Sequence, residues 1–132
     1  DRDPGRVALF VSPLVATGPD AATVSAERER QRALLATLYS TPSYWPTLEL
    51  HGWGSLGEKL NGMVRQNRWG ELSTLVSDEM LDVLMVTAEL GALADALKAK
   101  YAGLADAYVL TLPLADRDDA ALARVVGALK AG

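Results

Sequence analysis

Hydrophobic residues fall into two kinds of pattern along this chain. Nearly unbroken apolar runs lie within 7–15, 82–87 and 107–112, and such runs are typical of short strands buried on both faces. Between them, apolar residues recur at helical spacing, most clearly around 90–101. The order strand, helix, helical insertion, strand, helix, strand, helix predicts an α/β fold with three parallel strands joined by right-handed crossovers.

Capping residues place the ends of the helices. Asp20 follows a Gly-Pro turn and is the expected N-cap of a helix that runs to about Tyr39. Gly103 is expected to stop the helix that ends near 101. The last helix is expected to begin after Asp118 or Asp119, either of which is suited to the N-cap.

Residues 40–53, called the aromatic segment here, are unlike the rest of the chain. They contain two of the three Trp residues, the only His and two Pro, and they separate two strongly helical patterns. Aromatic density argues against disorder, and long ordered connections in compact domains are usually functional. We therefore expect an irregular, ordered connection that forms, with the helices after it, an insertion over 40–82.

Composition narrows the classes of protein to which the chain can belong. Of its 132 residues, 49% are hydrophobic, which suits a globular core, and the net charge is -4. The lack of a basic stripe argues against nucleic-acid binding, and the lack of a long apolar run argues against a membrane span. Absence of Cys excludes disulfides and thiolate chemistry and fits a reducing interior. We expect a cytoplasmic protein with no nucleic-acid or membrane partner.

Signatures of metal and nucleotide chemistry are missing. The acidic residues near 116–119 do not have the spacing of a calcium loop, and the chain has no set of zinc ligands. No phosphate-loop lysine motif or Gly-x-Ser-x-Gly motif is present either. The sequence therefore predicts no metal site and no self-sufficient catalytic set.

The stretch from Tyr39 to Trp53, set between an amphipathic helix and 56–69, resembles the C-terminal part of the luciferase-like monooxygenase superfamily. The resemblance is closest to its actinobacterial branch, which uses the deazaflavin coenzyme F-420. It implies the C-terminal βα units of a TIM-type β/α barrel, in which the three apolar runs would be the sixth, seventh and eighth strands. Residues 1–132 would then be a single partial domain, and the start at Asp1 suggests a fragment of something longer.

The resemblance also implies a function. Enzymes of this superfamily transfer a hydride between a flavin or deazaflavin and a small organic substrate, so F-420, or FMN in its place, is the expected coenzyme. Most coenzyme contacts would come from the missing strands, and the isolated chain is expected to be inactive. Its expected partners are that substrate, whose identity stays open, and the remaining half of the barrel or a second copy. The alternative is a non-catalytic, flavodoxin-like α/β module that binds a partner.

Barrel enzymes carry their chemistry at the C-terminal ends of the strands. On this mapping Thr17, Gly18 and Thr87 lie at such ends and precede helix N-termini, where backbone N–H groups bind phosphate. They are the candidate coenzyme-binding residues. The other interpretation is that they are ordinary turn and cap residues, and the turn after Thr87 lacks the Gly and Pro that many relatives have there.

The aromatic segment supplies the other candidates. His51 is the only His and can act as a general acid or base near neutral pH, with Glu49 close enough in sequence to orient it. Tyr44, Trp45 and Trp53 are expected to line a substrate pocket by stacking. The alternatives are that His51 holds backbone groups in place and that the aromatic side chains pack the insertion against its helices.

Overall fold

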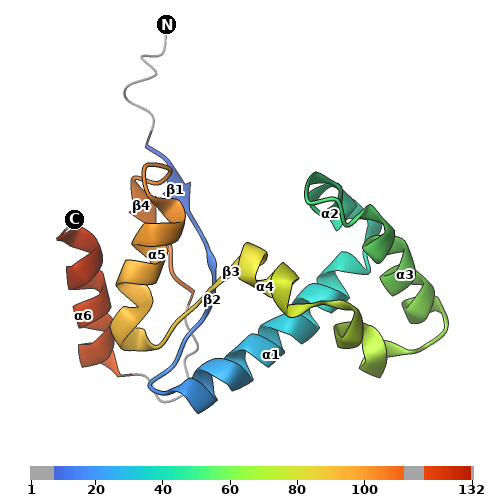
Figure 1. Ribbon diagram of the computed structural model, residues 1–132, viewed down its shortest axis with the longest axis horizontal. Coiled ribbons are helices and arrows are strands. Elements are labelled where there is room, and N and C mark those ends of the chain that lie inside the picture. The colour runs from blue at the N-terminus through green and yellow to red at the C-terminus, as the bar shows by residue number, and fades with distance from the viewer. Residues whose placement is uncertain (1–7, 112–117, 132) are drawn as a thin grey trace, which may run out of the picture. The chain divides into compact units, whose positions relative to one another are not determined.

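The structure is a computed structural model that describes residues 8–111 and 118–131. The described chain is mostly helical and divides into two compact units (Figure 1). The first unit contains the strands and is built from residues up to Glu27 and from Leu84 onward, and the second runs from Arg28 to Val83. Within the described ranges, every helix is too short or too polar to span a bilayer.

The strands of the first unit are short and pair in parallel. β1 (Phe10–Val11) pairs with β4 (Ala107–Tyr108), and β2 (Leu14–Ala16) pairs with β3 (Met85–Thr87). β1 and β2 follow each other in the chain and are separated by a Ser-Pro dipeptide, because proline has no N–H to donate to a ladder. Strands therefore form within all three expected runs. The start of the first run, at 7, and the end of the third, at 112, lie outside the described residues.

The predictions of an α/β fold with three parallel strands and of the C-terminal units of a TIM-type barrel are both wrong. Each described strand has only two or three residues, and they form two separate two-stranded sheets. In a barrel of βα units the second and third strands would be neighbours, whereas here β3 and β4 both pair with the N-terminal extended segment. The second run is short as a strand because α4 (Asp78–Leu84) occupies half of it. Local apolar patterns located the strands, but their lengths and order depend on long-range pairing.

Helices pack beside the strands in the first unit. η4 (Leu90–Ala92) leads into α5 (Leu93–Tyr101), and α6 (Asp119–Lys130) packs against both. Gly103 has a φ of +69° just after α5, as expected of a helix stop, and Asp118 is the N-cap of α6. The core of this unit consists of Val15, Val86, Leu93, Ala94, Leu97 and Val125.

α1 (Ala21–Tyr39) begins in the first unit and continues into the second. The Asp20 side chain accepts a hydrogen bond from the Thr23 N–H at 2.8 Å, which confirms Asp20 as the N-cap. This backbone hydrogen bond lowers the pKa of the Asp20 carboxyl below its ordinary value. The helix therefore begins after its predicted N-cap and ends at Tyr39, as expected.

The second unit is helical throughout its described secondary structure. It contains η2 (Pro42–Tyr44), α2 (Trp45–Leu50), α3 (Gly54–Arg65), η3 (Trp69–Leu75) and α4, in addition to most of α1. The expectation of an irregular aromatic segment is wrong, because η2 and α2 occupy most of it. Each of these two helices has a proline in its first turn, where the missing N–H costs nothing. Fully buried leucines on five helices supply the core: Leu35, Leu48, Leu60, Leu72 and Leu81.

Two arginines of α1 hold the start of α4 within the second unit. Arg28 Nη2 lies 2.8 Å from Asp82 Oδ1 and donates to the Asp78 carbonyl at 3.1 Å. Arg32 donates to Glu29 at 2.9 Å and also to the Asp78 carboxylate. These hydrogen bonds from Arg32 lower the pKa of both carboxyls. The network is a structural clamp, since both of its arginines are paired with carboxylates of the same unit.

Candidate functional site

Three of the candidate residues meet at the C-terminal ends of β2 and β3. Ala16, the last residue of β2, pairs with Thr87, the last residue of β3, so Thr17 and Gly18 leave the sheet beside Thr87. The Leu90 N–H donates to the Gly18 carbonyl at 2.9 Å and ties the two loops together. The structure thus brings together residues that are about 70 positions apart in sequence, at the edge where parallel α/β proteins bind ligands.

Thr17 has an unusual environment for a polar side chain. Only 4% of the residue is exposed, and its Oγ1 atom has no hydrogen-bond partner among the described residues. Buried hydroxyls nearly always have a partner, because burying one unpaired costs about 1–3 kcal/mol. The described residues alone therefore leave this hydroxyl without a hydrogen bond.

Gly18 allows the chain to turn closely against the start of α1. A Cβ added at Gly18 would lie 2.5 Å from Thr23 Cγ2 and 2.7 Å from Thr23 Cβ, closer than atoms approach without displacement. Thr23 is branched at Cβ and stiff in its χ1 angle, so it has little freedom to move away. Glycine is therefore needed here for space.

A pocket of about 420 Å³ lies next to this strand end in the first unit. Pro19, which follows Gly18, forms part of its wall, and the remainder comes from η4, α5 and α6, which begin at the same end of the unit (Figure 1). The wall is mainly aliphatic, with Arg124 and Asp118 as the charged lining residues. Its apolar part includes Pro19, Leu90, Ala94, Ala121, Val125 and Ala128.

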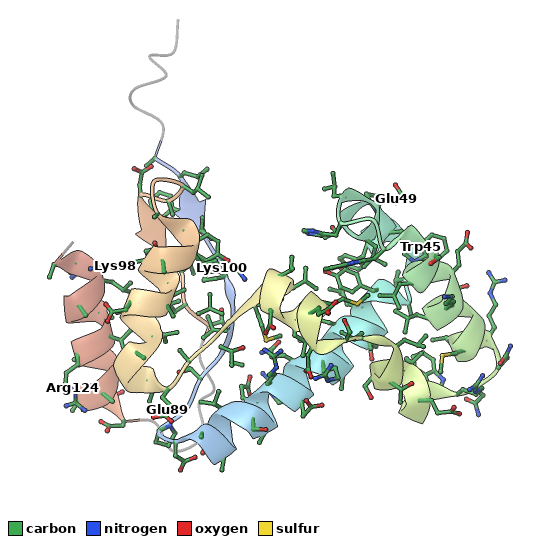
Figure 2. All side chains as sticks on the ribbon, in the orientation of Figure 1. Trp45, Glu49, Glu89, Lys98, Lys100 and Arg124 are labelled. Atoms are coloured by element: carbon green, nitrogen blue, oxygen red, sulfur yellow. The ribbon has the colours of Figure 1, made fainter. Side chains whose placement is uncertain are left out.

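The two charged lining residues differ in their hydrogen bonding. Asp118 Oδ1 accepts a hydrogen bond from the Ala121 N–H at 2.9 Å and so caps α6. Arg124 makes no ion pair or hydrogen bond with any residue in the described part of the chain. Figure 2 shows Arg124 in the half of α6 that begins at the pocket. The pocket therefore offers one guanidinium that no other described residue binds.

No metal centre is evident in the part of the chain that the structure describes. No group of three or more His, Asp or Glu side chains there is close enough to hold an ion. In the acidic region near 116–119, Asp118 is committed to capping, and residues 116 and 117 lie outside the described ranges.

Trp45 is a packing residue in the second unit. Its Nε1–H donates to the Tyr39 carbonyl at 3.0 Å. Its ring lies over Gly57 of α3, where an added Cβ would be 2.4 Å from the ring atoms Cδ1 and Nε1. Figure 2 shows Trp45 and Glu49 on α2 beside α3. These contacts favour the interpretation that Trp45 packs the insertion against its helices.

His51 and Trp53 form a second feature of the aromatic segment. Their rings stack, with centroids 4.8 Å apart and an interplanar angle of 24°. His51 is exposed, and no described residue hydrogen-bonds to its imidazole, so Glu49 does not orient it. Tyr44 is exposed nearby in sequence, at the end of η2. The structure therefore presents Tyr44 and the His51–Trp53 stack at the surface, and their role toward a substrate stays a prediction.

Sequence reasoning overlooked the pocket and its arginine. Ala121, Arg124, Val125 and Ala128 are spaced 0, 3, 4 and 7, so they occupy one face of α6. A single cation within a stripe of small apolar residues was a detectable signal. What the sequence did not contain was the position of η4 and α5 opposite that face.

Comparisons with known proteins add relatives but no function. No protein-family model matches the chain, and no solved structure matches it. The uncharacterized proteins Rv1360 of Mycobacterium tuberculosis and Mb1395 of Mycobacterium bovis are each 33% identical to it over 105 residues. The aligned region covers 80% of this chain but 31% of each relative. The chain thus spans about a third of the length of the curated relatives it matches.

Proposed function

We propose that this chain is a segment of a flavin- or deazaflavin-dependent oxidoreductase that transfers a hydride to or from a small organic substrate. Coenzyme F-420 is the proposed coenzyme, with FMN as the alternative. Support comes from the luciferase-like character of the stretch from Tyr39 to Trp53 and from relatives three times longer than the aligned region. The barrel geometry is no part of the proposal.

The observation that carries the proposal is the buried hydroxyl of Thr17 without a described partner at the ends of two parallel strands. This hydroxyl is closed off in the free chain, so the strand end would open for it to donate to an anionic or carbonyl oxygen of a bound molecule. Gly18 keeps the neighbouring backbone free of a side chain, and Thr87 ends the adjacent strand. These three residues fit one polar portion of a coenzyme, and its ring system is left to other parts of the longer protein.

The bound coenzyme would supply the hydride chemistry, while the protein would orient the reactants and keep out water. In the complete enzyme we assign Tyr44, His51 and Trp53 to the substrate side, with His51 as the proton donor or acceptor. Trp45 would support them indirectly, by fixing α2 against α3. The isolated chain would have no turnover, and a cytoplasmic location is proposed because F-420 and FMN are intracellular coenzymes.

The test uses the complete protein that contains this chain, titrated with F-420 and with FMN while coenzyme fluorescence is followed. Thr17→Val removes the hydroxyl without changing the shape of the side chain, and Thr17→Ser retains the hydroxyl. We expect Thr17→Val to weaken coenzyme binding by about tenfold, the usual effect of one lost hydrogen bond to a charged group, and Thr17→Ser to bind like the parent. Equal binding by both variants, or no binding of either coenzyme by the parent, would contradict the proposal.

A second candidate is a non-catalytic module whose partner, the remainder of the longer protein or a second copy of the chain, covers part of the first unit. Large apolar side chains are exposed on and beside β1 and β4, namely Leu9, Phe10, Leu104 and Val109. Such residues together often mark an interaction surface. If the complete protein binds neither coenzyme but forms a stable complex that Phe10→Ser abolishes, this candidate is the better account.

A further inference from the structure

The pocket at the start of α5 and α6 has a chemistry that the coenzyme proposal does not use. We infer that it is a binding site for a small aliphatic carboxylate, whose charge is taken up by Arg124 and whose apolar body lies against the wall formed by η4, α5 and α6. Neither Thr17 nor Thr87 lines this pocket, so the inference stands independently of the proposed coenzyme.

The guanidinium of Arg124 carries a charge that no described residue pairs with. Arg124 has five N–H donors and no partner among the described residues. A guanidinium presents its donors in a planar fork that matches the two oxygens of a carboxylate. By contrast, Arg28 and Arg32 of the second unit are both bound to carboxylates of their own unit. Arg124 therefore differs from arginines whose role is structural.

The wall of the pocket is mostly apolar and suits an alkyl chain. Small or aliphatic side chains form most of it, and Ala94 and Val125 are buried as part of the unit's core. Among the described lining residues there is no aromatic ring on which a base or a flavin would stack. At about 420 Å³ the volume lies within the range of small-molecule pockets. The apolar part of the ligand is thus expected to be an alkyl chain.

The charge of Asp118 favours a carboxylate over phosphate as the bound anion. Asp118 also lines the pocket, and its carboxylate is fixed at the helix start by the hydrogen bond from Ala121. Arg124 is six positions further along the chain, about 9 Å along the helix axis. A nearby negative charge penalises a dianion such as phosphate more than a monoanion. A carboxylate bound at Arg124, with its alkyl chain along the wall, avoids placing a second charge beside Asp118.

The experiment is an NMR titration of the purified protein with hexanoate, with hexanol and inorganic phosphate as comparison probes. We expect saturable shifts of the backbone amide signals of Ala121, Arg124 and Val125 with hexanoate. Arg124→Gln should weaken the hexanoate Kd by about tenfold, since it removes a charge-assisted pair. Lys98→Gln removes the same charge from α5 at a residue that is not part of the pocket lining, and it should leave the Kd unchanged.

A pair of alanine variants tests the location. Ala121→Leu places a larger side chain in the pocket and should abolish hexanoate binding, whereas Ala123→Leu adds the same atoms to an exposed position of α6 outside the lining. The inference is overturned if hexanol or phosphate binds as tightly as hexanoate, if hexanoate causes no saturable shift, or if Arg124→Gln binds like the parent. Because Arg124 is exposed, its substitution is not expected to unfold the protein, and this readout holds even if Ala121→Leu fails to fold.

Discussion

Thr17→Val should stabilise the protein, although most substitutions of buried residues do the opposite. The hydroxyl of Thr17 is buried, with 4% of the residue exposed, and the described structure gives it no hydrogen bond. Valine has nearly the same shape and the same branching at Cβ, so the replacement needs no rearrangement of the neighbouring strands. The free protein then no longer bears the desolvation of an unpaired polar group.

The size of the effect follows from two contributions. An unsatisfied buried polar group costs about 1–3 kcal/mol, and replacing the hydroxyl by a methyl group adds about 0.8 kcal/mol of apolar burial. Relaxation of the surroundings reduces both, so we expect a gain of about 1–2 kcal/mol in the free energy of unfolding. For a chain of 132 residues this corresponds to a rise in Tm of about 5 °C.

Denaturant unfolding followed by circular dichroism measures this gain, in the absence of any ligand. Ser40→Ala is the matched control, because Ser40 is also buried but donates from Oγ to the Thr37 carbonyl at 2.7 Å. That variant should lose about 1 kcal/mol. If Thr17→Val loses as much as Ser40→Ala, the Thr17 hydroxyl has a partner in the folded protein, and the reasoning about the strand end is refuted.

Further predictions concern packing, pH and turnover. Gly57→Ala should lower the free energy of unfolding by about 1–3 kcal/mol because the new Cβ would meet a tryptophan ring, while Gly62→Ala of the same helix, with open space around it, should raise it by up to about 1 kcal/mol. The lowered pKa values of Glu29 and Asp78 stabilise the folded state above their ordinary values of 4.5 and 3.8, so urea unfolding should show stability falling as the pH drops through that range, and a Glu29→Gln, Asp78→Asn double variant should show a weaker decline. In the complete enzyme His51→Ala should lower turnover while leaving Tm nearly unchanged. Unchanged turnover with a lower Tm would instead show that His51 is structural.

Local signals predicted the fold where the physics is local. The start of α1 was predictable because Asp20 supplies a cap whose partner is three residues away. The aromatic segment was misread as irregular because it is rich in aromatic residues and proline, although proline is tolerated in the first turn of a helix, where both prolines lie. Sheet order was not predictable, since nothing near Ala107 in sequence shows that it pairs with Phe10 rather than with β3.

The candidate site was predictable in the same partial way. Thr17, Gly18 and Thr87 were found from their positions at strand ends, and parallel pairing brings them together. The unpaired hydroxyl of Thr17 was not predictable, because whether a buried hydroxyl has a hydrogen-bond partner depends on all of its neighbours in the folded structure. Trp45 was assigned wrongly for the same reason. It was expected in a pocket, but its ring packs against Gly57, twelve positions later in the sequence.

The pairing of β1 with β4 has a consequence for the order in which the chain folds. The Leu9 N–H donates to Asp106 Oδ2 at 2.6 Å, so this end of the first unit closes only when residues 97 positions apart meet. The second unit uses one continuous stretch from Arg28 to Val83 and needs no such long closure. Because contacts between distant residues form slowly, the continuous stretch can fold during synthesis while β1 is still unpaired, before β4 has been made. During that interval the exposed side chain of Phe10 is a point at which nascent chains can associate wrongly.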